Sequence, residues 1–240
     1  MNVDLMSFAR AVSQGSVRVV DLTQTLSQEF PSIVLPPELG QCAPFRMEEV
    51  SRYDARGPAW YWNNITIGEH CGTHFDAPIH WISGRDLPNN SVDTLPLEHF
   101  IAPACVIDCS GEAQADADFL LTAGHVAAWE KRHGRIPAGS WVLMRTDWSK
   151  RTDPVAYQNL DETGQHTPGP DAGCVRLLVK ERDVLGFGTE AIGPMPDRRR
   201  TSSRPTLATT TCTAPANTGC NACAISICCR RRERSLSRRH

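Results

Sequence analysis

The feature that most constrains this chain is an eleven-residue run in which three histidines and one aspartate recur at short intervals. The run reads His70-Cys71-Gly72-Thr73-His74-Phe75-Asp76-Ala77-Pro78-Ile79-His80. On an α-helix, His70 and His74 would share a face, but Asp76 would lie about 240° around the axis from His70. Gly72 and Pro78 also oppose a helix. We therefore expect a loop that wraps these side chains around one point.

Convergent histidine nitrogens and a carboxylate oxygen are ligands that suit zinc or manganese at about 2.0–2.3 Å. His70, His74 and Asp76 are the candidate ligands, and His80 is left for proton transfer. The alternative is a chance grouping in a polar loop. Four such residues within eleven positions, in a chain with only eight histidines, argue against that alternative. The donor set does not distinguish Mn²⁺ from Zn²⁺.

Length and composition favour a single domain. A chain of 240 residues can bury one sizeable core but is short for two enzymatic domains. No run approaches the roughly 18 apolar residues of a membrane span, and no basic segment followed by an apolar one opens the chain. These features predict a cytoplasmic protein without a membrane partner and without structural disulfides.

Hydrophobic periodicity predicts a mixed α/β fold in which strands and helices alternate. A strand over residues 60–68 is expected to deliver the chain to His70, and Thr122 is a plausible helix N-cap. The expected helices cover residues 4–14, 122–131 and 172–181, and the other expected strands cover 17–22, 104–109, 140–146 and 184–188.

Residues 194–240 differ in composition from the rest of the chain. They contain ten Arg, no Lys and only Asp197 and Glu233 as acids, a net charge of +8 that leaves −10 for residues 1–193. No apolar period is visible, so little core is expected from this tail. We interpret it as a frameshifted or disordered extension. Cys220 and Cys223 give only one CxxC pair for zinc, and the absence of aromatic residues argues against nucleic acid as a partner.

Residues 70–80 match, at every fixed position, the motif His-x-Gly-Thr-His-x-Asp-x-Pro-x-His of the cyclase family, which includes bacterial kynurenine formamidases and isatin hydrolases. The chain resembles the isatin-hydrolase-like branch in further segments, and the resemblance extends over about residues 15–193. Those segments are residues 20–23, 57–64, 80–84 and 145–149.

The resemblance implies a swivelling β/β/α fold over residues 1–193, with a Mn²⁺ or Zn²⁺ site at His70, His74 and Asp76. It implies an acid/base role for His80. It also implies a segment after Gly193, with a His and a Gln or Glu that help to complete the metal site. That segment is not recognisable here, so the domain is expected to be incomplete at its C-terminus.

Aromatic and acidic residues near the motif are further candidates. Trp60, Trp62 and Trp81 flank the run and would suit a flat slot for an aryl substrate, although tryptophans are as often part of a core. Asp147 either orients a ligand histidine or caps the chain after a strand, with the second slightly favoured. Glu190 resembles a family Gly-x-Gly-Thr-Glu segment, with a structural or pocket-lining role rather than a ligating one.

The sequence therefore predicts a metal-dependent hydrolase of a cyclic amide or aryl formamide. An isatin-like lactam is favoured over N-formylkynurenine because of the aromatic residues 57–64, and the setting would be tryptophan or indole catabolism. The resemblance also suggests a homo-oligomer. The alternative is a catalytically impaired relative that retains partial metal binding because the C-terminal part of the fold is missing.

Overall fold

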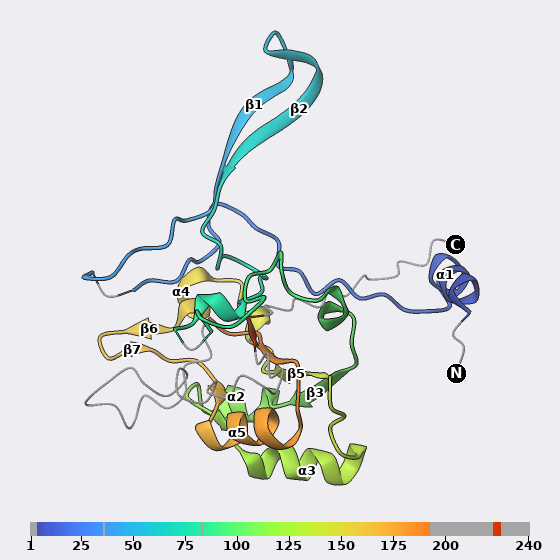
Figure 1. Ribbon diagram of the computed structural model, residues 1–240. Helices are drawn as coiled ribbons and strands as arrows, with labels where there is room; N and C mark the ends of the chain where they lie inside the picture. The colour runs from blue at the N-terminus through green and yellow to red at the C-terminus, as the bar shows by residue number, and fades with distance from the viewer. Residues whose placement is uncertain (1–3, 36, 83, 193–222, 227–240) are drawn as a thin grey trace, which may run out of the picture.

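A computed structural model of the protein describes residues 4–35, 37–82, 84–192 and 223–226. Its centre is a parallel sheet in the order β10–β9–β5–β3, with parallel pairing at each step (Figure 1). The strands are β3 (Ala104–Asp108), β5 (Trp141–Arg145), β9 (Gly186–Thr189) and β10 (Cys223–Ser226). The mixed α/β class expected from the sequence is confirmed.

Helices form the connections that a parallel sheet requires. The helices α2 (Ser110–Ala115) and α3 (Ala123–His133) join β3 to β5, and α5 (Ala172–Glu181) lies between β5 and β9. Thr122 caps α3 as expected, because its hydroxyl accepts from the His125 backbone N–H while the His125 ring accepts from the Thr122 backbone N–H. All three helices lie together beneath the sheet in Figure 1.

The main hydrophobic core lies between the sheet and these helices. Val142 and Met144 of β5 pack with Val126 of α3 and Leu178 of α5, and all four side chains are buried. Burying a side chain of this size contributes about 1.5–3 kcal/mol. The core therefore fixes β5, the strand whose C-terminal end leads into Asp147.

A long antiparallel hairpin projects from this body (Figure 1). It consists of β1 (Arg46–Asp54) and β2 (Gly57–Thr66), with register partners from Arg46↔Thr66 to Asp54↔Gly57. The strand expected at 60–68 is thus present and ends shortly before His70. Its partner β1 was not expected, because residues 46–54 show no apolar alternation.

The remaining elements are short. They are α1 (Leu5–Ser13), α4 (Pro154–Gln158), β4 (Leu120–Leu121) paired with β8 (Gly169–Pro170), β6 (Leu160–Asp161) paired with β7 (Gly164–Gln165), and the 3₁₀ turns Pro78–His80, Leu97–Phe100 and Trp148–Lys150. The helix expected over 4–14 is confirmed. The buried strand expected over 17–22 is wrong: this segment has no ladder partner among the described residues, and Val19 and Val20 are exposed.

Most of the predicted tail, residues 194–240, lies outside the described residues, so its reading frame and order stay predictions. The described part, β10, is a strand that the sequence did not lead us to expect. A parallel neighbour is held mainly by backbone hydrogen bonds, which four residues can make without a long apolar pattern. Among the described residues, none of the helices has the length and hydropathy needed to cross a bilayer.

Candidate metal centre

The loop of residues 70–80 follows β2 and ends in the 3₁₀ turn Pro78–His80, so the expected loop conformation is confirmed. Gly72 has φ +72°, which favours glycine. A Cβ at this position would also lie 2.5 Å from Leu26 Cδ2, so the N-terminal segment packs directly against the turn. Glycine is therefore favoured here by conformation, and any side chain at this position would also displace the end of the Leu26 side chain.

The turn brings His70, His74 and Asp76 together. Their candidate ligand atoms all lie within 4.8 Å of one another, and no other group of this kind occurs in the described part of the chain. Asp76 Oδ1 lies 2.8 Å from His70 Nδ1 and 3.3 Å from His74 Nε2. Two imidazoles around a buried carboxylate are a donor set that suits Zn²⁺ or Mn²⁺, so these residues fit such an ion.

A backbone contact orients one of the histidines. His74 Nδ1 lies 2.8 Å from the Gly72 carbonyl oxygen, which can accept a hydrogen bond from the ring. In neutral histidine this contact places the proton on Nδ1 and leaves the Nε2 lone pair to bind a metal ion, whereas in the protonated ring Nε2–H can donate to Asp76 Oδ1 at 3.3 Å. Metal-binding histidines commonly donate their second nitrogen in this way.

The loop has unusual electrostatics because its carboxylate is buried, with 5% of Asp76 exposed. Burial alone would raise the pKa of Asp76, but the hydrogen bond and charge of His74, with His80 and His70, outweigh it and lower the pKa. Burial likewise lowers the pKa of His74, yet contacts with Asp76 and the Gly72 carbonyl raise it overall. The site is thus arranged around a negative charge at Asp76.

His80 lies at the exposed edge of this group. Its ring centroid is 4.1 Å from that of His70 and 4.6 Å from that of Trp81. Desolvation is the largest influence on its pKa, and together with the neighbouring His70 and His74 it outweighs Asp76 and lowers the pKa. His80 therefore lies against His70, one of the three candidate ligands, and its lowered pKa favours the unprotonated ring at neutral pH.

The three tryptophans are separated in the structure. Trp81 contacts the His80 ring, whereas Trp60 and Trp62 lie on β2 with 52% and 54% of their surfaces exposed. Within the described residues, neither of these two rings contacts a histidine of the loop. Of the three tryptophans, only Trp81 therefore lies against a histidine of the loop in the described residues, and the substrate contacts of Trp60, Trp62 and Trp81 stay predictions.

Cys71 lies between two candidate ligands in the sequence but does not belong to the candidate ligand group. It is buried, and desolvation raises the pKa of its thiol, which keeps it protonated. Each cysteine that the structure describes outside β10 is a free thiol.

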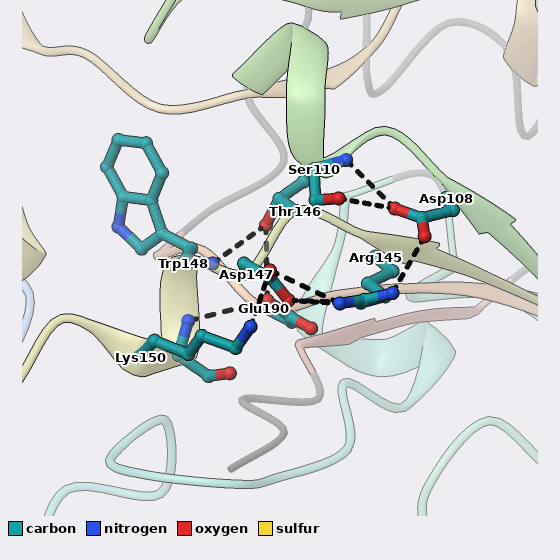
Figure 2. A network of polar contacts seen from close by, with 9 residues as sticks. Asp108, Ser110, Arg145, Thr146, Asp147, Trp148, Lys150 and Glu190 are labelled. Atoms are coloured by element: carbon teal, nitrogen blue, oxygen red, sulfur yellow. Dashed lines mark hydrogen bonds and ion pairs between the residues drawn. The ribbon is translucent and has the colours of Figure 1, made fainter. Parts of the chain in front are cut away.

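Asp147 and Glu190 belong to a polar network at the C-terminal ends of β5 and β9 (Figure 2). Asp147, at φ +56°, forms ion pairs with Arg145 and Lys150 rather than with a ligand histidine. This favours the structural reading of Asp147, although an ion-pair role replaces the expected side-chain cap. Glu190 is buried, and its Oε2 lies 3.4 Å from both Thr146 Oγ1 and Ser149 N.

One residue in contact with the loop, Gln24, was not expected from the sequence. Gln24 is buried and donates its backbone N–H at 2.9 Å to Thr73 Oγ1 of the candidate metal-binding loop, residues 70–80, which we call the metal loop. Its side chain reaches the Ser149 carbonyl at 3.5 Å. These contacts join residues that are 49 and 125 positions apart, so no local sequence pattern reveals them. The one local signal is that the polar Gln24 lies between the apolar residues Leu22 and Leu26.

A family model described as "Putative cyclase" matches residues 20–194, most of the chain. The protein therefore belongs to the cyclase family, as the motif at residues 70–80 predicted.

Within the cyclase family, the chain is more similar to isatin hydrolases than to kynurenine formamidases. The chain is 48% identical over 181 residues to isatin hydrolase from Roseibium aggregatum, covering 75% of this chain and 68% of that one. The solved structure of isatin hydrolase A from Ralstonia solanacearum matches at 49% identity and TM-score 0.86, over 96% of this chain and 86% of that one. Kynurenine formamidase from Polaromonas naphthalenivorans is 26% identical over 54% of this chain and 58% of its own length. The similarity is to enzymes that hydrolyse cyclic amides and formamides.

Proposed function

We propose that this protein is a metal-dependent hydrolase that opens an isatin-like lactam. The observation that carries the proposal is the convergence of His70, His74 and Asp76 on one loop, in a chain 48% identical to an isatin hydrolase. The much lower identity to kynurenine formamidase, 26%, favours a cyclic amide over N-formylkynurenine. Indole catabolism is the corresponding metabolic setting.

We assign His70, His74 and Asp76 as the residues that hold Mn²⁺ or Zn²⁺. When bound, either ion polarises a carbonyl oxygen and lowers the pKa of water from 15.7 to about 7. The protein supplies the geometry: the Gly72 carbonyl fixes the His74 ring, and burial keeps Asp76 from bulk water. The choice between the two metals does not follow from the donors.

The hydrolysis of a lactam breaks the carbonyl carbon–nitrogen bond, adds hydroxide to the carbon and a proton to the nitrogen. We assign the proton transfer to His80. Its lowered pKa keeps the ring unprotonated at neutral pH, so it can accept the proton that water loses and donate it to the leaving nitrogen. The contact with the His70 ring, tilted by 47°, holds the His80 ring at the edge of the ligand group.

We propose that Trp81 forms one wall of the substrate slot, since its ring contacts the His80 ring. An apolar aromatic wall suits a planar aryl substrate. Trp60 and Trp62 are proposed as further aryl contacts, and they stand on the exposed hairpin.

The hairpin also supports the proposal of a homo-oligomer. Besides Trp60 and Trp62 it exposes Tyr53, Tyr61 and Ile65. Apolar exposure on this scale, on an element outside the core, is typical of an interaction surface. A second copy of the chain is the partner that we propose for it.

The function is tested by following isatin and N-formylkynurenine hydrolysis by ultraviolet absorbance, with Mn²⁺ or Zn²⁺ and after chelation. We expect isatin to be opened faster, the activity to disappear with the chelator, and added metal to restore it. Undiminished hydrolysis after complete metal removal would contradict the metal assignment. Stoichiometric metal with hydrolysis of neither substrate would instead establish the catalytically impaired alternative.

A further inference from the structure

A set of buried polar contacts connects the end of β9 to the metal loop, although the two are far apart in the sequence. Gln24, Thr146, Ser149 and Glu190 are all buried, with exposed fractions of 9%, 4%, 4% and 7%. Buried polar groups are costly unless they are hydrogen-bonded, so such a set is retained where it fixes a specific arrangement.

The first contacts fix the chain that follows β5. The Glu190 carboxylate accepts from Thr146 Oγ1 and from the Ser149 backbone N–H, each at 3.4 Å. The Glu190 carbonyl also accepts from the Tyr157 hydroxyl at 3.0 Å. Figure 2 shows the carboxylate among Thr146, Trp148 and Asp147, between the ends of β5 and β9. One residue thus anchors the segment 146–157 at three points.

That segment in turn holds the N-terminal segment. The Gln24 side chain donates to the Ser149 carbonyl at 3.5 Å, and Gln158 Nε2 donates to the Ser32 carbonyl at 3.2 Å. The rings of Phe30 and Tyr157 also lie 6.1 Å apart. Residues 24–32 are therefore attached to residues 149–158 by two hydrogen bonds and an aromatic contact.

The N-terminal segment finally contacts the metal loop on either side of its tightest turn. Gln24 donates its backbone N–H to Thr73 Oγ1 at 2.9 Å, and Leu26 fills the space that a side chain at Gly72 would need. The same Gly72 carries the carbonyl that orients His74. A displacement of residues 24–26 would therefore shift the Gly72 carbonyl and change the orientation of the His74 ring.

We infer that Glu190 is a positioning residue for the metal loop, acting through Ser149 and Gln24 to hold the Gly72–Thr73 turn that orients His74. The inference rests on the proposed metal centre and deepens it, because it adds a support outside residues 70–80. Glu190 acts as a hydrogen-bond acceptor here. A glutamine at this position, whose side-chain oxygen accepts the same two hydrogen bonds, should preserve the effect.

The test is the Mn²⁺ dissociation constant of the full chain, measured by the loss of the free-ion electron paramagnetic resonance signal. Supporting residues around a metal site change affinity by about 10–100-fold, and Glu190→Ala should weaken binding within this range. Glu190→Gln should stay within about threefold of wild type. Gln24→Ala keeps the backbone contact and should give an intermediate loss.

A matched control separates loop positioning from general destabilisation. Glu130 is another largely buried carboxylate, bonded to Arg182 Nε at 2.7 Å and to the Ile136 backbone N–H at 3.0 Å, and it lies on α3. Glu130→Ala should lower the melting temperature but leave Mn²⁺ affinity unchanged. An equal loss of affinity in this control would overturn the inference.

The outcomes distinguish the inference from the function on which it rests. Wild-type protein that binds no Mn²⁺ would overturn the metal centre and the inference together. Wild-type binding with unchanged affinity in Glu190→Ala would overturn only the inference. If Glu190→Ala does not fold, as judged by circular dichroism, Glu190→Gln and Gln24→Ala decide: a Glu190→Gln loss above tenfold, or no loss in Gln24→Ala, would overturn it.

Discussion

The metal loop and the β1–β2 hairpin are adjacent in the sequence but are held in opposite ways. The loop of residues 70–80 is braced from outside, by Gln24 and Leu26 against its turn, and Asp76 is buried. The hairpin is held by its own ladder and leaves Trp60 and Trp62 exposed. In this chain the short motif at residues 70–80 thus depends on distant residues for its shape, whereas the hairpin does not.

The largest effect is expected from the loop's central carboxylate. Asp76→Asn should reduce lactam turnover by at least about 10³-fold, because metal polarisation of a carbonyl is worth several kcal/mol. Turnover and metal content should fall together. The control Asp86→Asn changes an exposed carboxylate paired with its neighbour Arg85 and should have no effect. Full metal occupancy in Asp76→Asn would remove this residue from the ligand set.

The edge of the same loop should behave differently from its centre. His80→Ala should reduce turnover by about 10²–10⁴-fold while metal content stays at the wild-type level, because general acid–base catalysis contributes an effect of this size. His133→Ala, at the end of α3, is a control that should leave both unchanged. Equal loss of metal and turnover in His80→Ala would show that this histidine is a ligand.

A matched pair of tryptophans compares the body with the hairpin. Trp148 is 1% exposed and donates its ring N–H to the Tyr157 carbonyl, so Trp148→Ala should cost about 3–5 kcal/mol of unfolding free energy. Trp62→Ala, at a position exposed in the single chain, should cost less than about 0.5 kcal/mol at low protein concentration, where the proposed oligomer is dissociated, and more at high concentration. Urea denaturation at several protein concentrations measures both. Similar costs at every concentration would mean that the hairpin packs against its own chain.

Two glycines in the same conformation give the smallest and sharpest comparison. Gly72 and Gly15 have φ values of +72° and +73°, but only Gly72 faces another residue within 4 Å. Gly15→Ala should cost about 1–2 kcal/mol of unfolding free energy from conformation alone. Gly72→Ala should cost about 1–3 kcal/mol more, because Leu26 must move, and it should also weaken metal binding. Equal costs in thermal unfolding would show that Leu26 does not brace the loop.

The parts of the fold that local pattern specifies were predicted well. The strand β5 and the helices α3 and α5 lie within or near their expected ranges, and Thr122 caps α3, because apolar periodicity and capping are properties of neighbouring residues. The strand predicted over residues 17–22 was wrong because strand formation also depends on residues far away in the sequence. Its apolar run resembles a strand, but a strand also needs a partner, which local sequence does not reveal.

The candidate site, like the fold, was predicted where local sequence specifies it and missed where it depends on distant residues. The convergence of His70, His74 and Asp76 followed from spacing, with Gly72 as the turn residue. The two hydrogen bonds of Gln24 did not follow from spacing, because their partners, Thr73 Oγ1 and the Ser149 carbonyl, are far away in the sequence. Such contacts depend on tertiary structure, and one of them involves only backbone at Ser149.

We propose that one loop, residues 70–80, supplies three ligands to one metal ion. Anomalous diffraction from crystals of the full chain grown with Mn²⁺ or Zn²⁺ tests this most directly. The structure predicts one strong peak at about 2.0–2.3 Å from nitrogens of His70 and His74 and an oxygen of Asp76. A peak bound elsewhere, or none near these residues at saturating metal, would contradict the claim.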